Sequence, residues 1–186
     1  MFQEPKVAQM AAFLLEKAGG RLEILKLMKL MYLADREAMD RYGAPISFDS
    51  MVSMPHGPVL SRTLDYMNGN LPSAPGGWDD LIRDREGHML SLRDGFAARR
   101  NELTLLSDAD IDILDATWKK FGAMSGSQLR SFTHNHCAEW KDPEGSSRPI
   151  SERDVFLALG KSEEVARELA EAIEAERAAD RVLARL

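Results

Sequence analysis

The chain of 186 residues lacks features that mark several classes of protein. It has one cysteine, Cys137, so an internal disulfide is excluded, which suits a reducing compartment. No apolar run approaches the roughly 20 residues that span a bilayer. The N-terminal residues MFQEPK do not show the basic and then apolar order of a secretion signal. We therefore expect a cytoplasmic protein that does not enter a membrane.

Positive charge is also scarce. The chain has 24 Lys and Arg residues against 30 Asp and Glu residues, and its formal net charge is −6. Proteins that bind nucleic acids usually present a basic face. No helix-turn-helix pattern with a basic recognition helix is visible either. We therefore do not expect nucleic acid as a partner, and a DNA-binding autoregulator is kept only as an alternative.

Familiar catalytic motifs are missing too, among them the glycine-rich phosphate loop, the G-x-S-x-G elbow and H-E-x-x-H. The residues closest to such chemistry are His134, His136 and Cys137, with His56 elsewhere in the chain. Their spacing is not that of a usual zinc site, and on a helix positions 134 and 136 point away from each other. We predict no metal and no other cofactor; a metal-dependent hydrolase built on these residues is the alternative.

What the sequence contains is typical of one globular domain, with 44% hydrophobic and 29% charged residues. Apolar spacing and stop signals predict helices over about 5–20, 22–42, 58–68, 107–122, from 125 onward, 151–160 and 162–185. Residues 46–54 are expected to be extended, and 81–92 to form a hairpin. The predicted fold class is mainly α (α+β): a compact helical domain around a central buried helix, with a small antiparallel β element and a C-terminal helical arm.

The segment over 22–42 is the predicted central helix. Its apolar stripe is wide, which indicates neighbours on more than one side. Lys26 and Lys29 belong to the opposite, charged face in this pattern. We expect that face to be solvated, with an acid-binding surface as the alternative.

The most restricted stretch of backbone surrounds His56, with Pro55 before it and Gly57 and Pro58 after it. Each proline fixes its own φ, and glycine permits angles that other residues avoid. We expect an extended run to end here, turn at a fixed angle and enter a helix at Pro58, where the missing N–H costs nothing. The His56 ring is expected to bond a carbonyl or a hydroxyl such as that of Tyr32 or Ser61; a polar group in a recognition groove is the alternative.

The last predicted helix, over 162–186, carries a narrow apolar stripe made of Val165, Leu169, Ile173, Ala179, Leu183 and Leu186. Such a stripe suits an arm that packs on a partner. A solvated helix that covers the end of the domain is an equally good interpretation. We therefore divide the chain into a main domain over 1–160 and a charged C-terminal helix over 162–186.

Three of these stretches together resemble the Panacea domain of SocA-like antitoxins. Lys26 to Ala34 is similar to its K-L-x-K-L-x-Y-x-A helix, Ser53 to Ser61 to its H-G-P-V turn, and Ser131 to Ile150 to its late Ser/Thr-His…Trp…Ile pattern. Many members have E-A-W before the turn, where this chain has Val52-Ser53-Met54. The residues that carry the resemblance, for the fold or for partner binding, are Lys26, Lys29, Tyr32, Met54, Pro55, His56, Gly57, Pro58, Val59, Ser61, His134 and Trp140.

The resemblance implies a non-enzymatic antitoxin that neutralises its cognate protein toxin by direct binding. In the SocA-like type it further implies a proteolytic adaptor, which delivers a replication-blocking, SocB-like toxin to the ClpXP protease. We take this adaptor type as the preferred expectation.

Overall fold

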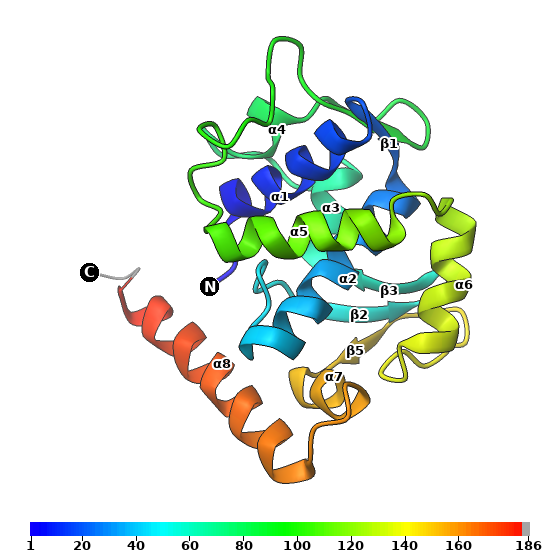
Figure 1. Cartoon of the computed structure of the whole chain (residues 1–186), viewed down its shortest axis with the longest axis vertical. Helices are drawn as coiled ribbons and strands as arrows, with labels where there is room; N and C mark the ends of the chain where they lie inside the picture. Colours follow the sequence, from blue (N-terminus) through cyan, green and yellow to red (C-terminus); the bar gives the residue numbers. More distant parts are fainter. Residues whose placement is uncertain (184–186) are drawn as a thin grey trace.

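The computed structural model describes residues 1–183, and five antiparallel strands and eight helices lie within them (Figure 1). The helices are α1 (Glu4–Lys17), α2 (Ile24–Tyr42), α3 (Ser61–Met67), α4 (Trp78–Leu81), α5 (Asp108–Phe121), α6 (Gly126–His136), α7 (Glu152–Ala158) and α8 (Glu163–Leu183). The strands are β1 (Arg21–Glu23), β2 (Met51–Met54), β3 (Gly57–Leu60), β4 (Met89–Ser91) and β5 (Arg148–Ile150). The fold is mainly α with a small β element, as predicted.

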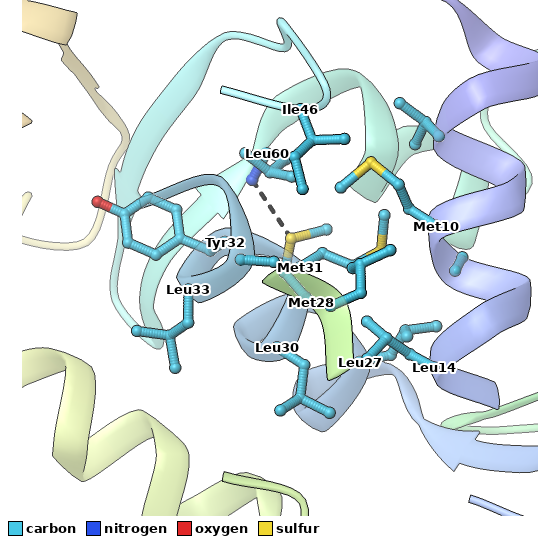
Figure 2. Packing of buried hydrophobic residues seen from close by; sticks show 14 of the residues in the cluster. Met10, Leu14, Leu27, Met28, Leu30, Met31, Tyr32, Leu33, Ile46 and Leu60 are labelled. Carbon is cyan, nitrogen blue, oxygen red and sulfur yellow. Dashed lines mark hydrogen bonds between the residues drawn. The ribbon is translucent and has the colours of Figure 1, made fainter. Parts of the chain in front are cut away.

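Helix α2 is the centre of the core, which confirms its prediction. It contacts α1, α5, α6 and β3, so apolar side chains are buried on several of its sides. Leu27, Leu30 and Met31 have no exposed surface. Figure 2 shows Met10 and Leu14 of α1 directed toward this helix. Each such side chain contributes about 1.5–3 kcal/mol when it leaves water, so α2 is the element on which the others are assembled.

The strands form two small sheets. In one, β1 pairs with β4; in the other, the order is β3-β2-β5, with Val52 opposite Val59 on one side and Pro149 on the other. The two arms of the predicted hairpin over 81–92 do lie antiparallel: bridges join Ile82 with Leu92 and Glu86 with Met89, and the Arg83 N–H donates to the Ser91 carbonyl at 2.9 Å. The second arm contains strand β4, which also pairs with β1 over the three residues Arg21–Glu23.

The prediction of a helix that starts at Pro58 is wrong. Gly57–Leu60 is strand β3, joined to β2 by the two residues Pro55 and His56, and α3 begins at Ser61. A proline without an N–H is accepted at a sheet edge as well as in a first helical turn. The helix starts later because Asp49 accepts hydrogen bonds from the N–H groups of Arg62 and Thr63, at 3.2 and 2.8 Å.

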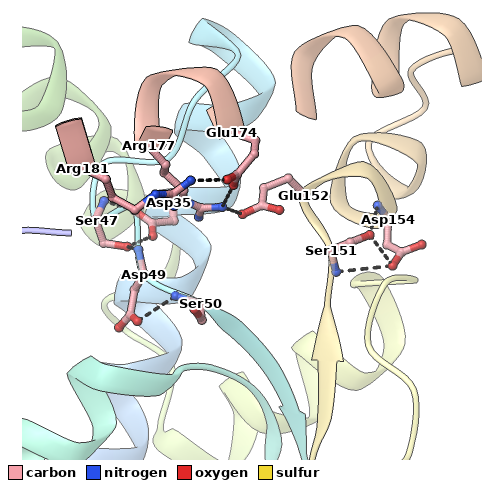
Figure 3. Close-up of polar contacts among 10 residues, drawn as sticks. All are labelled: Asp35, Ser47, Asp49, Ser50, Ser151, Glu152, Asp154, Glu174, Arg177 and Arg181. Atoms are coloured by element: carbon pink, nitrogen blue, oxygen red, sulfur yellow. Dashed lines mark hydrogen bonds and ion pairs between the residues drawn. The ribbon is translucent and has the colours of Figure 1, made fainter. Parts of the chain in front are cut away.

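Helix α8 lies on the domain through one narrow face. It contacts α7 and runs toward the N-terminus (Figure 1). Ala166 and Ile173 are buried, and Arg177 forms an ion pair with Glu152 of α7 at 2.5 Å (Figure 3). Val165 is 41% exposed, so it belongs to the outer face. The helix therefore covers the domain and also presents a free side; Leu186, the end of the predicted stripe, lies outside the described residues.

None of the helices within residues 1–183 has the length and hydropathy that would let it cross a membrane.

Candidate functional site

The three stretches that resemble the Panacea domain are called here the first motif (Lys26 to Ala34), the second motif (Ser53 to Ser61) and the third motif (Ser131 to Ile150). The first and second motifs meet at the outer edge of β3. The Lys29 ammonium donates a hydrogen bond to the Pro58 carbonyl at 2.6 Å. The Leu60 N–H donates to the Met28 sulfur at 3.3 Å, as the dashed line in Figure 2 shows. Pro58 itself has no N–H to satisfy. Two neighbouring side chains of α2 thus complete a strand edge that no other strand of residues 1–183 pairs with.

Lys29 is fully buried, so its assignment to a solvated face is wrong. Helix α2 is enclosed on that side as well, and the carbonyl of Pro58 replaces the water that the ammonium loses. Burial lowers the pKa of Lys29 to about 7, and a smaller effect of Cys137 opposes that shift. Lys26 is half-buried: it donates to the Gly122 carbonyl at 2.6 Å and lies 5.5 Å from the centre of the Trp118 ring.

Tyr32 connects the first motif to the third. Its hydroxyl donates to Glu139 at 2.7 Å, and Arg36 pairs with the same carboxylate oxygen at 2.8 Å. Burial, followed by the charge of Glu139, raises the pKa of Tyr32. The expected bond between Tyr32 and His56 is therefore wrong. His56 is exposed, and no hydrogen bond of its ring is present in the part of the chain that the structure describes.

The second and third motifs are joined through Trp140. Its indole N–H donates to the Met54 carbonyl at 3.0 Å, and the His134 ring stacks on the indole with centroids 3.8 Å apart. Burial lowers the pKa of His134, and the nearby charges of Arg130 and Lys29 add to that shift. The turn around His56 is thus held from both sides, by α2 and by Trp140.

The His/Cys cluster does not converge on one point. His134 faces Trp140, whereas His136 packs on Phe132 with centroids 4.5 Å apart. Cys137 is buried, and burial raises the pKa of its thiol to about 12, so the thiol stays protonated at neutral pH. Within residues 1–183 no group of three His, Cys, Asp or Glu side chains is placed to hold a metal ion.

Asp35 and Asp49 are among the buried carboxylates that the sequence did not reveal. Asp35 accepts bonds from the N–H groups of Ile46 and Ser47, both at 3.0 Å, and from the Ser47 hydroxyl (Figure 3). Burial raises the pKa of Asp35 to about 7, although the bonds from Ser47 oppose that rise. Asp49 holds the start of α3. Both fix the path of the chain from α2 into β2, and nothing in their sequence spacing distinguishes them from surface acids.

The motifs border an open groove of about 670 Å³. Its lining comes from the start of α2, the β2–β3 turn, α3 and two loops, over 23–29, 54–68, 85–88 and 145–147. The lining is mostly apolar, with Met28, Val59 and Leu64 among its side chains. Of the motif residues, Lys29, Met54, Pro55, His56 and Val59 line it.

The other motif residues support the groove from outside its lining. Gly57 and Pro58 are buried behind the turn, and the Ser61 N–H donates to the Ser50 carbonyl at 2.9 Å. Lys26, Tyr32, His134 and Trp140 have the contacts described above. Most of the motif residues therefore have their polar groups bonded within the domain, and several of them line or support an apolar hollow at the surface.

Comparison with known families identifies the class of protein. Residues 27–141 match the family described as antitoxin SocA-like, Panacea domain. This match covers more than half of the chain and includes the residues that join the three motifs, so the chain belongs to the SocA-like, Panacea-domain antitoxin family. No curated protein and no solved structure matched the chain.

Proposed function

We propose that this protein neutralises a cognate protein toxin by binding it directly. The observation that supports this function is the family match over 27–141, the region that contains most of the groove lining. The polar groups of the motif residues are engaged with one another, at Lys29 with Pro58, Tyr32 with Glu139 and Trp140 with Met54. Such an arrangement favours a rigid binding surface, because a preformed site loses less conformational freedom on binding.

The chemistry of the nucleophile candidates also favours binding over catalysis. A reactive cysteine needs a lowered pKa and access to solvent. Cys137 has a raised pKa and is buried. His56 is accessible, but Tyr32, the hydroxyl expected to orient it, is bonded to Glu139. The proposed action is therefore stoichiometric: each antitoxin molecule blocks the toxin molecule that it binds, without turnover.

We extend the proposal to a proteolytic adaptor that presents a replication-blocking, SocB-like toxin to ClpXP. An adaptor has to hold two partners at once. The groove lies at the start of α2, whereas α8 packs beside Gly43, at the end of that helix. The 19 residues of α2 extend over about 28 Å. The free side of α8 thus lies far enough from the groove to contact a second protein.

Co-expression tests the proposal. The small open reading frame next to this gene is expressed alone, with the tagged chain, and with a chain in which Gly57→Val disrupts the turn. We expect growth arrest in the first case, and rescue with a stoichiometric complex after affinity purification in the second. The third culture should arrest again. Absence of both a complex and toxicity would contradict an antitoxin function.

A further inference from the structure

We propose that the groove beside the β2–β3 turn is the docking site of the toxin, and that it receives a short peptide segment with apolar side chains and a carboxylate. This inference rests on the proposed antitoxin function and adds the binding face and the chemistry of the bound segment.

The lining favours apolar side chains. Its apolar side chains include Met28 of α2, Met54 at the end of β2, Val59 of β3 and Leu64 of α3. Burial of apolar surface is the main favourable term in association. Methionine side chains are flexible and polarisable, so two of them let the lining adapt to the side chains that enter.

The charges favour a carboxylate on the bound segment. The titratable residues that line the groove are Lys29, His56, Arg85 and His88, with Glu23 as the acid. This distribution is the reverse of the whole chain, which has a formal net charge of −6. Association is favoured when opposite charges meet across an interface.

Lys29 also favours a carboxylate. It is one of the residues that line the groove, it has no exposed surface, and its ammonium donates to the carbonyl of Pro58 in the adjoining strand at 2.6 Å. Within residues 1–183 no carboxylate lies at ion-pair distance from it, and Glu139 is paired with Arg36. A charge in a medium of low dielectric acts more strongly than one in water. A carboxylate that enters the groove would therefore supply the counter-charge that Lys29 lacks.

Arg85 supplies the second cationic contact. One terminal nitrogen of its guanidinium donates to the Asn68 side chain at 2.7 Å, which holds the side chain at the edge of the groove. An arginine offers several further N–H donors in a planar fork that matches a carboxylate. Arg85 is exposed, so those donors are accessible to a partner.

The shape favours a peptide over a small ligand. The groove is open, and its rim consists of exposed turns from three separate parts of the chain, at 55–56, 85–88 and 145–147. Small-molecule sites usually enclose most of their ligand. A segment of chain can instead cross an open groove and place alternate side chains into it.

Binding of the purified toxin to the full chain tests the docking site. Leu64→Glu places a charge among the apolar side chains, and Arg85→Glu reverses the charge at the edge. Each should weaken the complex by at least about tenfold, the first because it places a charge among apolar contacts and the second because it turns a charge attraction into a repulsion. The matched controls are Val165→Glu on α8 and Arg99→Glu on an exposed loop, which should change Kd by less than about twofold. Circular dichroism confirms folding, and because Arg85 is exposed its variant tests the site even if Leu64→Glu unfolds.

Overlapping peptides from the toxin test the chemistry of the segment. We expect one apolar peptide with Asp or Glu to bind the chain and compete with intact toxin, and to lose binding when its acid becomes an amide. If toxin binds the wild type and both groove variants equally well, the groove is not the docking site and the antitoxin function stands. If toxin does not bind the wild type, the antitoxin function itself fails. If peptide binding survives loss of the acid, the carboxylate contact is refuted.

Discussion

The ammonium of Lys29 is buried, and it donates a hydrogen bond to the Pro58 carbonyl at the edge of β3. Both partners of this hydrogen bond have fixed positions. Lys29 belongs to α2, the centre of the core, and Pro58 belongs to β3, where it has no N–H to donate to another strand. Burial lowers the pKa of Lys29 to about 7, so the ammonium and the neutral amine are about equally populated near neutral pH. The protonation state of Lys29 is thus coupled to the position of the β2–β3 turn.

This coupling predicts a pH dependence of stability. In the unfolded chain Lys29 has the ordinary pKa of 10.5, whereas in the folded protein the pKa is about 7. Between these values the unfolded state binds more protons, so this residue makes the free energy of unfolding rise with pH. From pH 7 to 9 the contribution amounts to about 2–3 kcal/mol. Urea unfolding at pH 7, 8 and 9 should show this rise in the wild type and a flatter profile in Lys29→Met. Parallel profiles would show that Lys29 titrates normally.

Gly57 predicts a steric effect at the same turn. Its φ is +94°, and a Cβ there would lie 2.8 Å from the Thr133 hydroxyl and 3.1 Å from the Lys29 nitrogen. Gly57→Ala should therefore lower stability by about 2–4 kcal/mol, through backbone strain and crowding together. Gly87→Ala is the matched control, because its φ is also positive at +63° but no atom lies within 4 Å. That control should cost only about 1–2 kcal/mol of strain. Thermal unfolding compares the stability of the two variants. Equal losses of stability would show that crowding by Thr133 and Lys29 does not contribute at Gly57.

At the scale of the element, α8 depends on one row of contacts. Ile173 is 1% exposed, whereas Val165 on the same helix is 41% exposed. Ile173→Ala should destabilise the docking of α8 by about 2–4 kcal/mol, and Val165→Ala by less than about 1 kcal/mol. Hydrogen exchange should show faster exchange across α8 in the first variant, while α2 keeps its protection. If α2 lost protection equally, α8 would be an integral part of the core.

Elements with strong local signals could be predicted from the sequence. The long apolar periodicity of α2 identified the central helix, and Ser107, Ser125 and Ser151 begin their helices with capping boxes. β5 could not be predicted, because three residues become a strand only through pairing with the distant β2. Pro58 suits a helix start and a strand edge equally well. Its environment, which lies in α2 and not in the local sequence, decides between the two.

The candidate site was predictable only as a set of residues. The motifs pointed to Lys29, His56 and Trp140, but polar residues on a helix normally indicate the solvent side, so the burial of Lys29 was missed. For His56 the rigid neighbours suggested that its ring bonds a carbonyl or a hydroxyl such as that of Tyr32, whereas the ring is exposed and the Tyr32 hydroxyl donates to Glu139. The groove itself could not be predicted, because its lining comes from four segments spread between residues 23 and 147, whose packing depends on the whole fold.

At the scale of the whole molecule, the groove and the outer side of α8 are two surfaces joined by the rigid α2. An antitoxin that only blocks its toxin needs the first surface, whereas an adaptor needs both. Removing residues 162–186 separates these cases. The buried side chains of α2 pack mainly against α1, α5, α6 and β3, so the shortened chain should remain folded. Its groove should bind toxin with an affinity within about threefold of the full chain, since distant changes are usually independent.

The decisive readout for the adaptor is the half-life of the toxin in cells. With the full chain, the toxin should disappear quickly when ClpX is present and persist when ClpX is absent. With the shortened chain the toxin should persist in both strains, although it stays bound and growth continues. The double substitution Val165→Glu and Val182→Glu, on the exposed side of α8, should reproduce the shortened chain without removing the helix. Rapid degradation with the shortened chain would show that α8 recruits no protease. If the toxin is stable with the full chain in the presence of ClpX, the protein is not an adaptor and acts only by blocking its toxin.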